Sequence, residues 1–365
     1  MNLKKYDHFT TTPGFYSGYE LLSKTDKNGN KPEIYAALTN RSAGKSTFFN
    51  GYLVRKFIKT GQKFILLYRN KYEVDRAADG FFNDISTLFY PDLAMDQQTG
   101  IKNGFDFLRI GLKSDEKKEH YQMCGFATSL AASELIKRYS HLLSDAGIIL
   151  MDELFPENGV YLKDEIRRFM SIHDSLSRGH FQHSKYLPVI MVGNLIDLFN
   201  PYFDALGIVD SLLLDSHFTR GDGFVIEQDF NEASAQAHKE SSFHRALSGA
   251  DYAAASQEKV YLNTDYDMID NSVCDIGRYI LTIRYNGSLY SVRYNEQGFF
   301  YYISDRPDPS FALQHAATEK DITEQAIYNP TSPYRKMIKD KYRQNLCKFR
   351  NLKCKSAAMH FIAGK

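Results

Sequence analysis

The chain has 365 residues, enough for two domains with sizeable cores, and its 43% hydrophobic and 24% charged residues are ordinary for a soluble globular protein. The net charge of +1 excludes a uniformly basic or acidic chain, although residues 335–365 carry ten Lys or Arg against one acid, Asp340, which suggests an anionic partner. No apolar run approaches ~18 residues and no signal peptide is evident, so we expect a soluble intracellular protein with no membrane contact.

In chain order, a polar and irregular start (residues 1–32) is followed by an apolar run, Ile34–Leu38, that predicts a buried strand. Apolar residues then recur at helical spacing from Phe48 to Phe57, and Gly61 is placed to end that helix. The next apolar run, Phe64–Tyr68, predicts a second buried strand. Strands and helices that alternate in this way are typical of a parallel α/β sheet.

A polar turn ending in Gly-Lys-Ser lies between the first strand and the first helix, which is the arrangement of a phosphate-binding loop. Backbone N–H groups of such a turn face an anion, Lys45 reaches the terminal phosphates, and the Ser46 hydroxyl can ligate Mg²⁺. The match to G-x-x-x-x-G-K-[ST] is imperfect because Thr39 stands in place of the first Gly, and an ordinary strand-to-helix turn remains the alternative. The predicted nucleotide-binding residues are Arg41, Ser42, Ala43, Gly44, Lys45, Ser46 and Thr47.

A second motif follows the apolar run Ile148–Met151, which ends in two carboxylates, Asp152 and Glu153. A buried strand of this kind delivers its acids to the sheet edge, where Asp152 can hold Mg²⁺ and Glu153 can polarise the attacking water. A solvated acidic turn is the alternative for this pair alone. Two motifs in this order, each at a strand end, favour a nucleoside triphosphatase.

Two further strand or helix ends carry candidate residues. The predicted helix Leu162–Leu176 ends near Arg178, which is either a basic residue favoured by the helix dipole or an arginine finger offered to a neighbouring subunit. The predicted strand Leu187–Val192 is followed by Asn194, either a turn residue or a group that bonds the catalytic water or the γ-phosphate.

The remaining chain predicts a linker and a smaller α+β domain. Residues 231–259 are rich in Ala, Ser, Glu and Gln and predict a helical linker. Residues 279–303 form three strand-like runs with a tight Asn286-Gly287 turn between the first two, and a helix-rich basic tail follows Pro333. We therefore expect a nucleotide-binding domain over residues 1–230, a linker over 231–259 and a C-terminal domain over 260–365.

The loop from Asn40 to Ser46, with Arg41 inside a deviant Walker A motif, resembles that of phage terminase-type packaging ATPases. Further stretches narrow the resemblance to the DNA-encapsidation ATPases of small short-tailed phages with protein-primed, unit-length genomes. These stretches are Phe64–Lys71, Ile148–Leu154, His173–Arg178 and Val192–Phe203. The resemblance covers residues 30–205 well and the remainder weakly.

This resemblance implies a RecA-like P-loop ATPase domain of the ASCE class that works with ATP and Mg²⁺. The family forms a homopentameric ring on the portal vertex of a prohead in the host cytoplasm and drives double-stranded DNA into the shell. It also uses a structural RNA at that vertex, which the basic C-terminal tail could bind, although a solvated amphipathic helix explains that tail equally well.

The resemblance also implies residue roles. Lys45, Ser46, Asp152 and Glu153 fall on the Walker A and Walker B positions, Arg41 on a nucleotide-sensing arginine, and Arg178 on the trans-acting finger. The expected second trans cation lies in the segment of Lys137 and Arg138. Lys71, with Arg69 beside it at the same strand end, falls near a position that faces the DNA channel, although a solvated surface lysine is the alternative.

The larger terminases carry a ribonuclease-H-like nuclease at the C-terminus, with acids on its first strand. The comparable run here, Ile280–Tyr285, offers Arg284 and no acid. Metal-dependent cleavage needs clustered carboxylates, so we expect a vestigial domain that does not cut. Two other functions remain open from the residues: a cellular-type DNA translocase or helicase, and a non-catalytic nucleic-acid-binding module.

Overall fold

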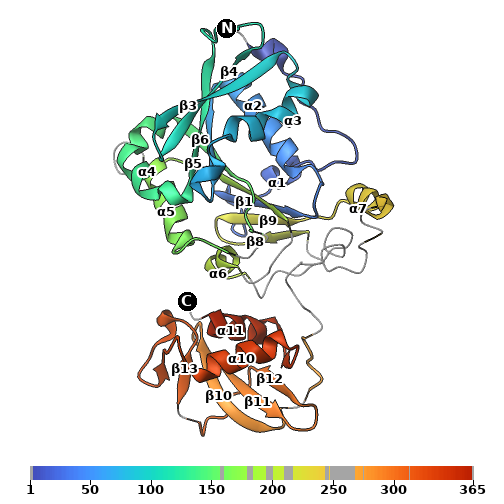
Figure 1. The fold of residues 1–365 in the computed structure, drawn as a ribbon, viewed down its shortest axis with the longest axis vertical. Helices are drawn as coiled ribbons and strands as arrows, with labels where there is room; N and C mark the ends of the chain where they lie inside the picture. The colour runs from blue at the N-terminus through green and yellow to red at the C-terminus, as the bar shows by residue number, and fades with distance from the viewer. Residues whose placement is uncertain are drawn as a thin grey trace. The chain divides into compact units, whose positions relative to one another are not determined.

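The computed structural model describes residues 3–156, 160–178, 184–194, 200–208, 217–242, 246, 268–273, 275–311 and 313–363. It divides into two compact units, shown in Figure 1. The first comprises Met1–Asp197 and Leu213–Leu262, and the second comprises Leu198–Leu212 and Asn263–Lys365. The sequence analysis placed residues 198–212 in the nucleotide-binding domain, whereas here they group with the second unit. No helix in the described part of the chain is long and apolar enough to span a bilayer.

The first unit is built on a nine-stranded sheet in the order β3-β4-β5-β2-β6-β7-β1-β9-β8. Its centre is parallel, as predicted, but β3 and β4 and the edge strand β8 pair antiparallel. The strands are β1 (Ile34–Thr39), β2 (Lys63–Tyr68), β3 (Leu93–Ile101), β4 (Phe105–Leu112), β5 (Gln122–Ser129), β6 (Ala146–Met151), β7 (Val189–Asn194), β8 (Phe218–Arg220) and β9 (Phe224–Gln228). Because β7 is inserted between β1 and β6, the two predicted motifs lie two strands apart, which fits the RecA-like fold.

The predicted helices of the first unit are present, but their bounds differ from the predicted ones. The first predicted helix runs Lys45–Thr60 and ends at Gly61, which adopts the left-handed conformation with φ 74°. Within the predicted linker helix, residues 231–259, the structure has the helix α7. Residues 243–245 and 247–259 lie outside the described residues. The α-helices are α1 (Tyr19–Ser23), α2 (Lys45–Thr60), α3 (Ala77–Phe89), α4 (Ser133–Tyr139), α5 (Glu165–Leu176) and α7 (Glu232–Glu240). Short 3₁₀ turns span Leu3–Tyr6, Lys71–Glu73, Leu130–Ala132 and Ser140–Leu143.

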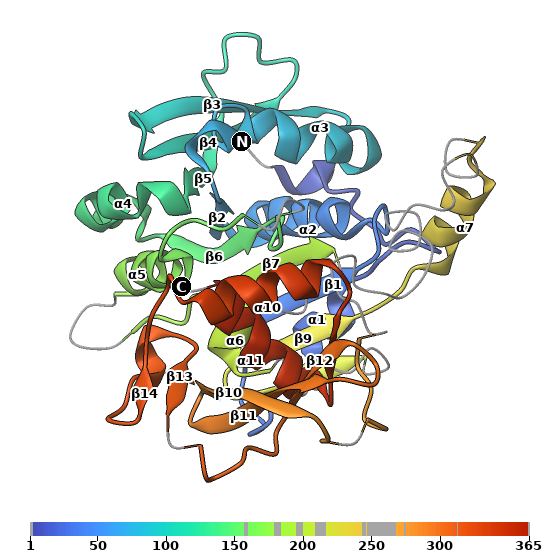
Figure 2. The same ribbon diagram turned by 60° about the horizontal axis from the view of Figure 1, so that its bottom comes forward.

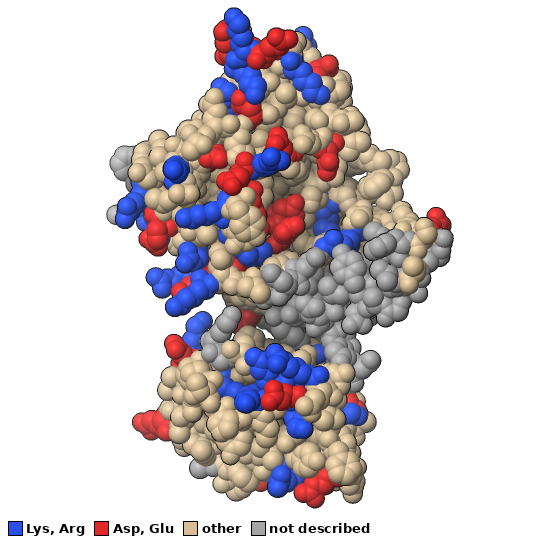
Figure 3. Space-filling view, in the orientation of Figure 1, with Lys and Arg blue, Asp and Glu red and all other residues tan. Residues whose placement is uncertain are grey.

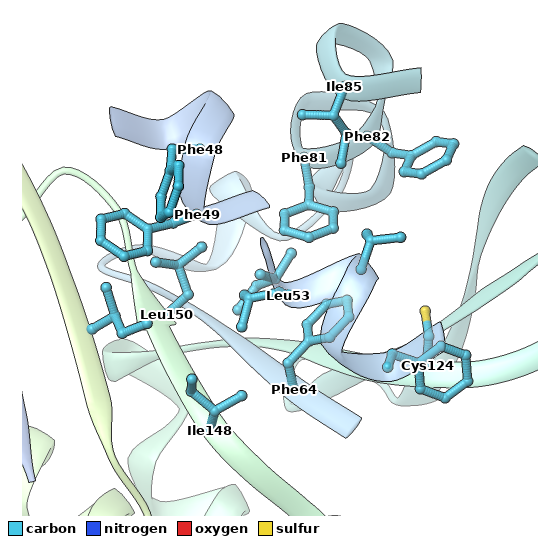
Figure 4. Close-up of a cluster of buried hydrophobic side chains, with 14 of the residues drawn as sticks. Phe48, Phe49, Leu53, Phe64, Phe81, Phe82, Ile85, Cys124, Ile148 and Leu150 are labelled. Atoms are coloured by element: carbon cyan, nitrogen blue, oxygen red, sulfur yellow. The ribbon is translucent and has the colours of Figure 1, made fainter. Parts of the chain in front are cut away.

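Aromatic side chains of α2 and α3 pack on the central strands, as Figure 4 shows. Phe49 of α2, Phe64 of β2 and Phe81 of α3 are all buried there, and each such side chain stabilises the fold by about 1.5–3 kcal/mol. Ile65 and Leu67 point to the opposite face of β2 and are buried as well, which explains the continuous apolar run. The polar N-terminal segment also contributes core residues, which the sequence analysis missed: Leu3, Phe9, Tyr16 and Leu21.

The second unit contains a six-stranded sheet in the order β14-β13-β10-β11-β12-β15. Its strands are β10 (Arg278–Tyr285), β11 (Ser288–Asn295), β12 (Phe300–Ser304), β13 (Gln314–Ala316), β14 (Ala326–Ile327) and β15 (Cys347–Phe349). The predicted antiparallel meander is present as β10–β11–β12. Its first turn has φ of 47° at Asn286 and 77° at Gly287, the positive values that a tight hairpin needs.

Two helices, α10 (Pro333–Arg343) and α11 (Leu352–Ala363), lie against this sheet, as Figure 2 shows. The prediction that the basic end is a tail is therefore wrong, since α11 supplies core residues. Arg335 is only 3% exposed, and its guanidinium donates to the carbonyls of Asn329 (2.8 Å) and Ala316 (2.7 Å). Other cations stay exposed, and Figure 3 shows Lys and Arg gathered over this part of the unit.

A short helix from the middle of the chain, α6 (Pro201–Leu206), belongs to the second unit. Asp204 of α6 accepts hydrogen bonds from Tyr285 (2.5 Å), and its other carboxylate oxygen lies 3.4 Å from Nε2 of His360. The rings of Tyr285 and His360 stack at 4.5 Å. Burial lowers the pKa of His360, but the hydrogen bond and charge of Asp204, together with the Ser356 carbonyl and the charge of Asp321, outweigh burial and raise it overall.

We expect Asp204→Asn to lower the pKa of His360 relative to the wild-type chain, because the charge that opposes burial most strongly is removed while the Ser356 carbonyl and Asp321 remain. Since the pKa is raised on folding, the bridge stabilises the unit most below pH 6.5 and loses effect as the pH rises through the raised value. An NMR titration of selectively labelled histidines measures both values. Equal values in the two proteins would contradict this assignment.

Candidate nucleotide-binding site

The ends of β1, β6 and β7 meet at one edge of the first unit's sheet, because Thr39 pairs with Asn194 and Met151 with Met191 in register. A cavity of about 890 Å³ opens over these strand ends. It is lined by the whole of the predicted loop, Arg41 to Thr47, together with Asp152, Glu153 and Asn194. The sequence motifs thus converge on one pocket, of a size that suits a nucleotide.

The loop between β1 and α2 departs from helical geometry at two residues. Ser42 has φ 60° and Gly44 has φ 94°, so both lie in the left-handed region. A side chain at Gly44 would also come within 3.2 Å of the Phe15 ring. Tyr16 holds the loop from the same side, since its N–H donates to the Ala43 carbonyl (2.9 Å). The N-terminal segment therefore forms one wall of the pocket.

The ammonium of Lys45 is held by three oxygens. It donates to Oγ1 of Thr39 (2.6 Å), the Asn40 carbonyl (3.1 Å) and Oδ1 of Asn194 (3.1 Å). Burial lowers the pKa of Lys45 to about 8, while the charge of Asp152 opposes that shift. Thr39, which the motif would have as Gly, is fully buried and supplies an acceptor to this lysine. The departure from the motif therefore has a structural reason.

Ser46 and Asp152 lie together, since the serine hydroxyl hydrogen-bonds the aspartate. Burial raises the pKa of Asp152, whereas the bonds from Ser46 and the Glu153 N–H and the charge of Lys45 lower it. A partly buried carboxylate beside a hydroxyl, at the mouth of a phosphate pocket, is a donor set that Mg²⁺ accepts with water and phosphate oxygens as its remaining ligands. The residues present therefore fit the predicted metal.

Glu153 has φ 55°, a left-handed conformation that is uncommon for a residue with a side chain. Its N–H donates to Oδ1 of Asp152 (2.9 Å), and its side chain is exposed at the cavity. Burial, Asp152 and Glu73 raise the pKa of Glu153, while Arg69 and Arg41 lower it. A carboxylate with a raised pKa beside a phosphate pocket suits a general base.

Arg69 holds this turn rather than facing solvent. The side chain is 6% exposed, and its Nε donates to both carboxylate oxygens of Glu165 (3.1 Å each). Its two remaining nitrogens donate to the carbonyls of Glu153 (3.0 Å) and Leu154 (2.8 Å). This burial does not fit the prediction that Arg69 contacts DNA. The guanidinium instead fixes the backbone that carries the catalytic-base candidate.

The other predicted residues do not line the cavity of their own chain. Arg178 is exposed just beyond the end of α5, and its described contact is a backbone bridge to Ser184. Lys71 and Arg138 are exposed, and Lys137 pairs with Glu134 at 3.0 Å on the surface of α4. Sequence reasoning missed Glu165 and Glu73, which lie on other elements and carry no motif around them.

The chain is similar in sequence to proteins of one known family. The sequence model of the Podovirus DNA encapsidation protein (Gp16) family matches residues 14–364. The DNA packaging protein of Bacillus phage phi29 is 24% identical over 286 residues, which is 78% of this chain and 78% of that protein. The DNA packaging protein of Bacillus phage B103 is 24% identical over 289 residues, which is 79% of this chain and 82% of that one.

Two solved structures share the fold over nearly the whole chain. The bacteriophage phi29 viral genome packaging motor assembly is similar with a TM-score of 0.62 at 19% identity, covering 96% of this chain and 99% of that one. The Phi-28 gp11 DNA packaging motor is similar with a TM-score of 0.59 at 14% identity, covering 96% and 98%.

We expect Arg69→Ala to lower the free energy of unfolding by about 3–5 kcal/mol, because it breaks a buried ion pair and removes the cation that balances the Glu165 carboxylate. Lys71→Ala, two residues away on the surface, is the matched control and should change it by less than about 0.5 kcal/mol. Urea unfolding followed by circular dichroism measures both. A stable Arg69→Ala protein with weakened DNA binding would restore the original assignment.

Proposed function

Because this chain belongs to the Podovirus DNA encapsidation protein (Gp16) family, we propose that it is an ATP-driven motor that moves double-stranded viral DNA into a preformed prohead. The observation that carries the proposal is the convergence of Lys45, Asp152 and Glu153 on one cavity at the carboxyl edge of the sheet. Family membership favours genome packaging over a cellular translocase or helicase. The convergent site favours an enzyme over a passive nucleic-acid-binding module.

The loop residues 41–47 bind the phosphates of ATP through backbone N–H groups and the start of α2. Lys45 exchanges one of its three protein oxygens for a terminal phosphate oxygen, and the negative charge of the phosphate raises the lysine pKa that burial lowers. Ser46 and Asp152 would hold Mg²⁺, which supplies neutralising charge at the β- and γ-phosphates when bound. Asn194, which accepts a hydrogen bond from Lys45, would bond the γ-phosphate or the attacking water.

Glu153 orients and deprotonates the attacking water. Its raised pKa brings the proton affinity of the carboxylate nearer to neutral pH, where a general base is most effective. The bonds from Arg69 to the Glu153 and Leu154 carbonyls hold the left-handed turn, so the carboxylate is directed before the substrate arrives.

Arg178 completes the site of a neighbouring subunit. It is exposed and lies outside its own chain's cavity, which suits a cation that is donated across an interface. Arg138, with Lys137, is the candidate for a second such cation. A ring is the closed assembly that lets every subunit both give and receive a finger, and we propose a homopentamer on the portal vertex in the host cytoplasm.

DNA contacts come from exposed cations. Lys71 stands at the end of β2 on the surface and is the proposed contact in the first unit. In the second unit, Lys336, Lys339, Arg343 and Lys353 are exposed and suit an RNA or DNA backbone. That unit is proposed to be a non-cutting domain: Arg284 of β10 donates to Gln314 (3.4 Å), and the described residues contain no cluster of three metal-ligating side chains.

Glu153→Gln should keep ATP binding but lower DNA-stimulated ATP hydrolysis and packaging by about 10²–10⁴-fold, because the amide cannot accept the proton of water. Phosphate release in the presence of purified proheads and DNA measures the rate. Glu116→Gln, on an exposed stretch between β4 and β5, is the matched control and should be fully active. Full activity of Glu153→Gln would refute the assigned base.

Arg178→Ala should be inactive alone but recover activity when mixed with Glu153→Gln subunits. In such rings an intact Glu153 meets an arginine from its neighbour, so some sites are complete. The measurement is ATP hydrolysis against the ratio of the two variants at constant total protein. Arg167→Ala, an exposed change on the same helix, should stay active. A mixture no more active than its parts would place Arg178 in its own subunit's site or outside catalysis.

A further inference from the structure

The outer side of the Walker A loop contacts the start of α7. The side chain of Asn40 pairs with the backbone of Asn231 in both directions: its amide donates to the Asn231 carbonyl (3.1 Å), and its oxygen accepts from the Asn231 N–H (2.9 Å). One turn further, the Ser234 hydroxyl donates to the Arg41 carbonyl (2.5 Å). Three hydrogen bonds thus join two segments about 190 residues apart in the chain.

These contacts between the Walker A loop and α7 are buried, and the N-terminal segment also takes part in them. Asn40 is 2% exposed and Ser234 8% exposed, so these bonds are shielded from water. The side chain of Asn231 caps α7 by accepting from the Ser234 N–H (2.7 Å) and donates to the Gly14 carbonyl (2.8 Å). Residue 14 directly precedes Phe15, which rests against Gly44 of the loop.

The loop needs this external support. The loop places Ser42, a residue with a side chain, in the left-handed region, which costs conformational free energy, whereas Gly44 adopts its positive φ without strain. The carbonyls of Asn40 and Arg41 are both used in fixing it, one by Lys45 from inside and the other by Ser234 from outside. A loop ordered in advance loses less conformational entropy when it binds phosphate.

We propose that the first turn of α7 is a positioning element for ATP, in which Ser234 and Asn231 hold the Walker A loop in its phosphate-binding form. This rests on the proposed function. By linkage, ATP must then stabilise the first turn of α7 as much as that turn stabilises bound ATP.

Ser234→Ala removes one of the three bonds without touching the loop itself. We expect the Kd and KM for ATP to rise about fivefold, the effect of one lost hydrogen bond, while kcat at saturating ATP is unchanged. Asn231→Ala, which loses the cap of α7 and the bond to Gly14, should likewise raise the KM for ATP and leave kcat unchanged. Gln236→Ala is the matched control, because Gln236 lies on the exposed side of α7 and bonds only Glu240 among the described residues.

Amide hydrogen exchange tests the coupling without reference to activity. In the wild-type chain, a non-hydrolysable ATP analogue with Mg²⁺ should slow exchange in residues 41–47 and in 232–236 together. In Ser234→Ala the protection of 232–236 should be lost at an analogue concentration that still protects the loop.

Unchanged KM in Ser234→Ala, or protection of the loop without protection of α7 in the wild type, overturns the inference and leaves the nucleotide site intact. A fall in kcat with no change in KM also overturns it, because a positioning role acts on binding. If the analogue protects neither segment in the wild type, the proposed nucleotide site itself is refuted.

Discussion

The ammonium group of Lys45 is the contact on which the site depends, because it ties the ends of two strands and the intervening loop into one geometry. Its three acceptors come from Thr39 at the end of β1, from the loop backbone and from Asn194 at the end of β7. These groups meet only because β7 is inserted beside β1 in the sheet. The lysine can therefore make these contacts only with this order of strands. Because burial removes part of its hydration, the ammonium group is ready to bind an anion.

Around this cation, other side chains stabilise backbone segments that have unusual conformations. Arg69 satisfies the carbonyls of the turn at Glu153, and its own charge is balanced by Glu165. Ser234 and Asn231 do the corresponding work for the Walker A loop. Arg69 and Ser234 bind backbone carbonyls and Asn231 bonds the side chain of Asn40, so the side chains that face the cavity remain available for substrate.

The motifs and the elements that carry them could be predicted because their signals are local: an apolar run, a turn of fixed composition, a helical period. The Asn286-Gly287 hairpin is of the same kind. Arg69 was misassigned because its partner, Glu165, lies 96 residues away and no pattern links them. The basic end was misassigned because charge composition cannot show that Arg335 bonds buried carbonyls. Edge strands such as β3 and β8 are too polar or too short for apolar periodicity to detect.

The chain passes into the second unit twice, once as α6 and once after residue 262. Asp204 supplies the partner of Tyr285 and His360, and Tyr202 and Phe203 beside it are buried. A chimera that exchanged only the C-terminal third between two phages would therefore combine the sheet of one protein with the α6 helix of the other. An exchange of whole units needs three splice junctions, at 197/198, 212/213 and 262/263, and recombination at a single crossover should leave a mismatched interior.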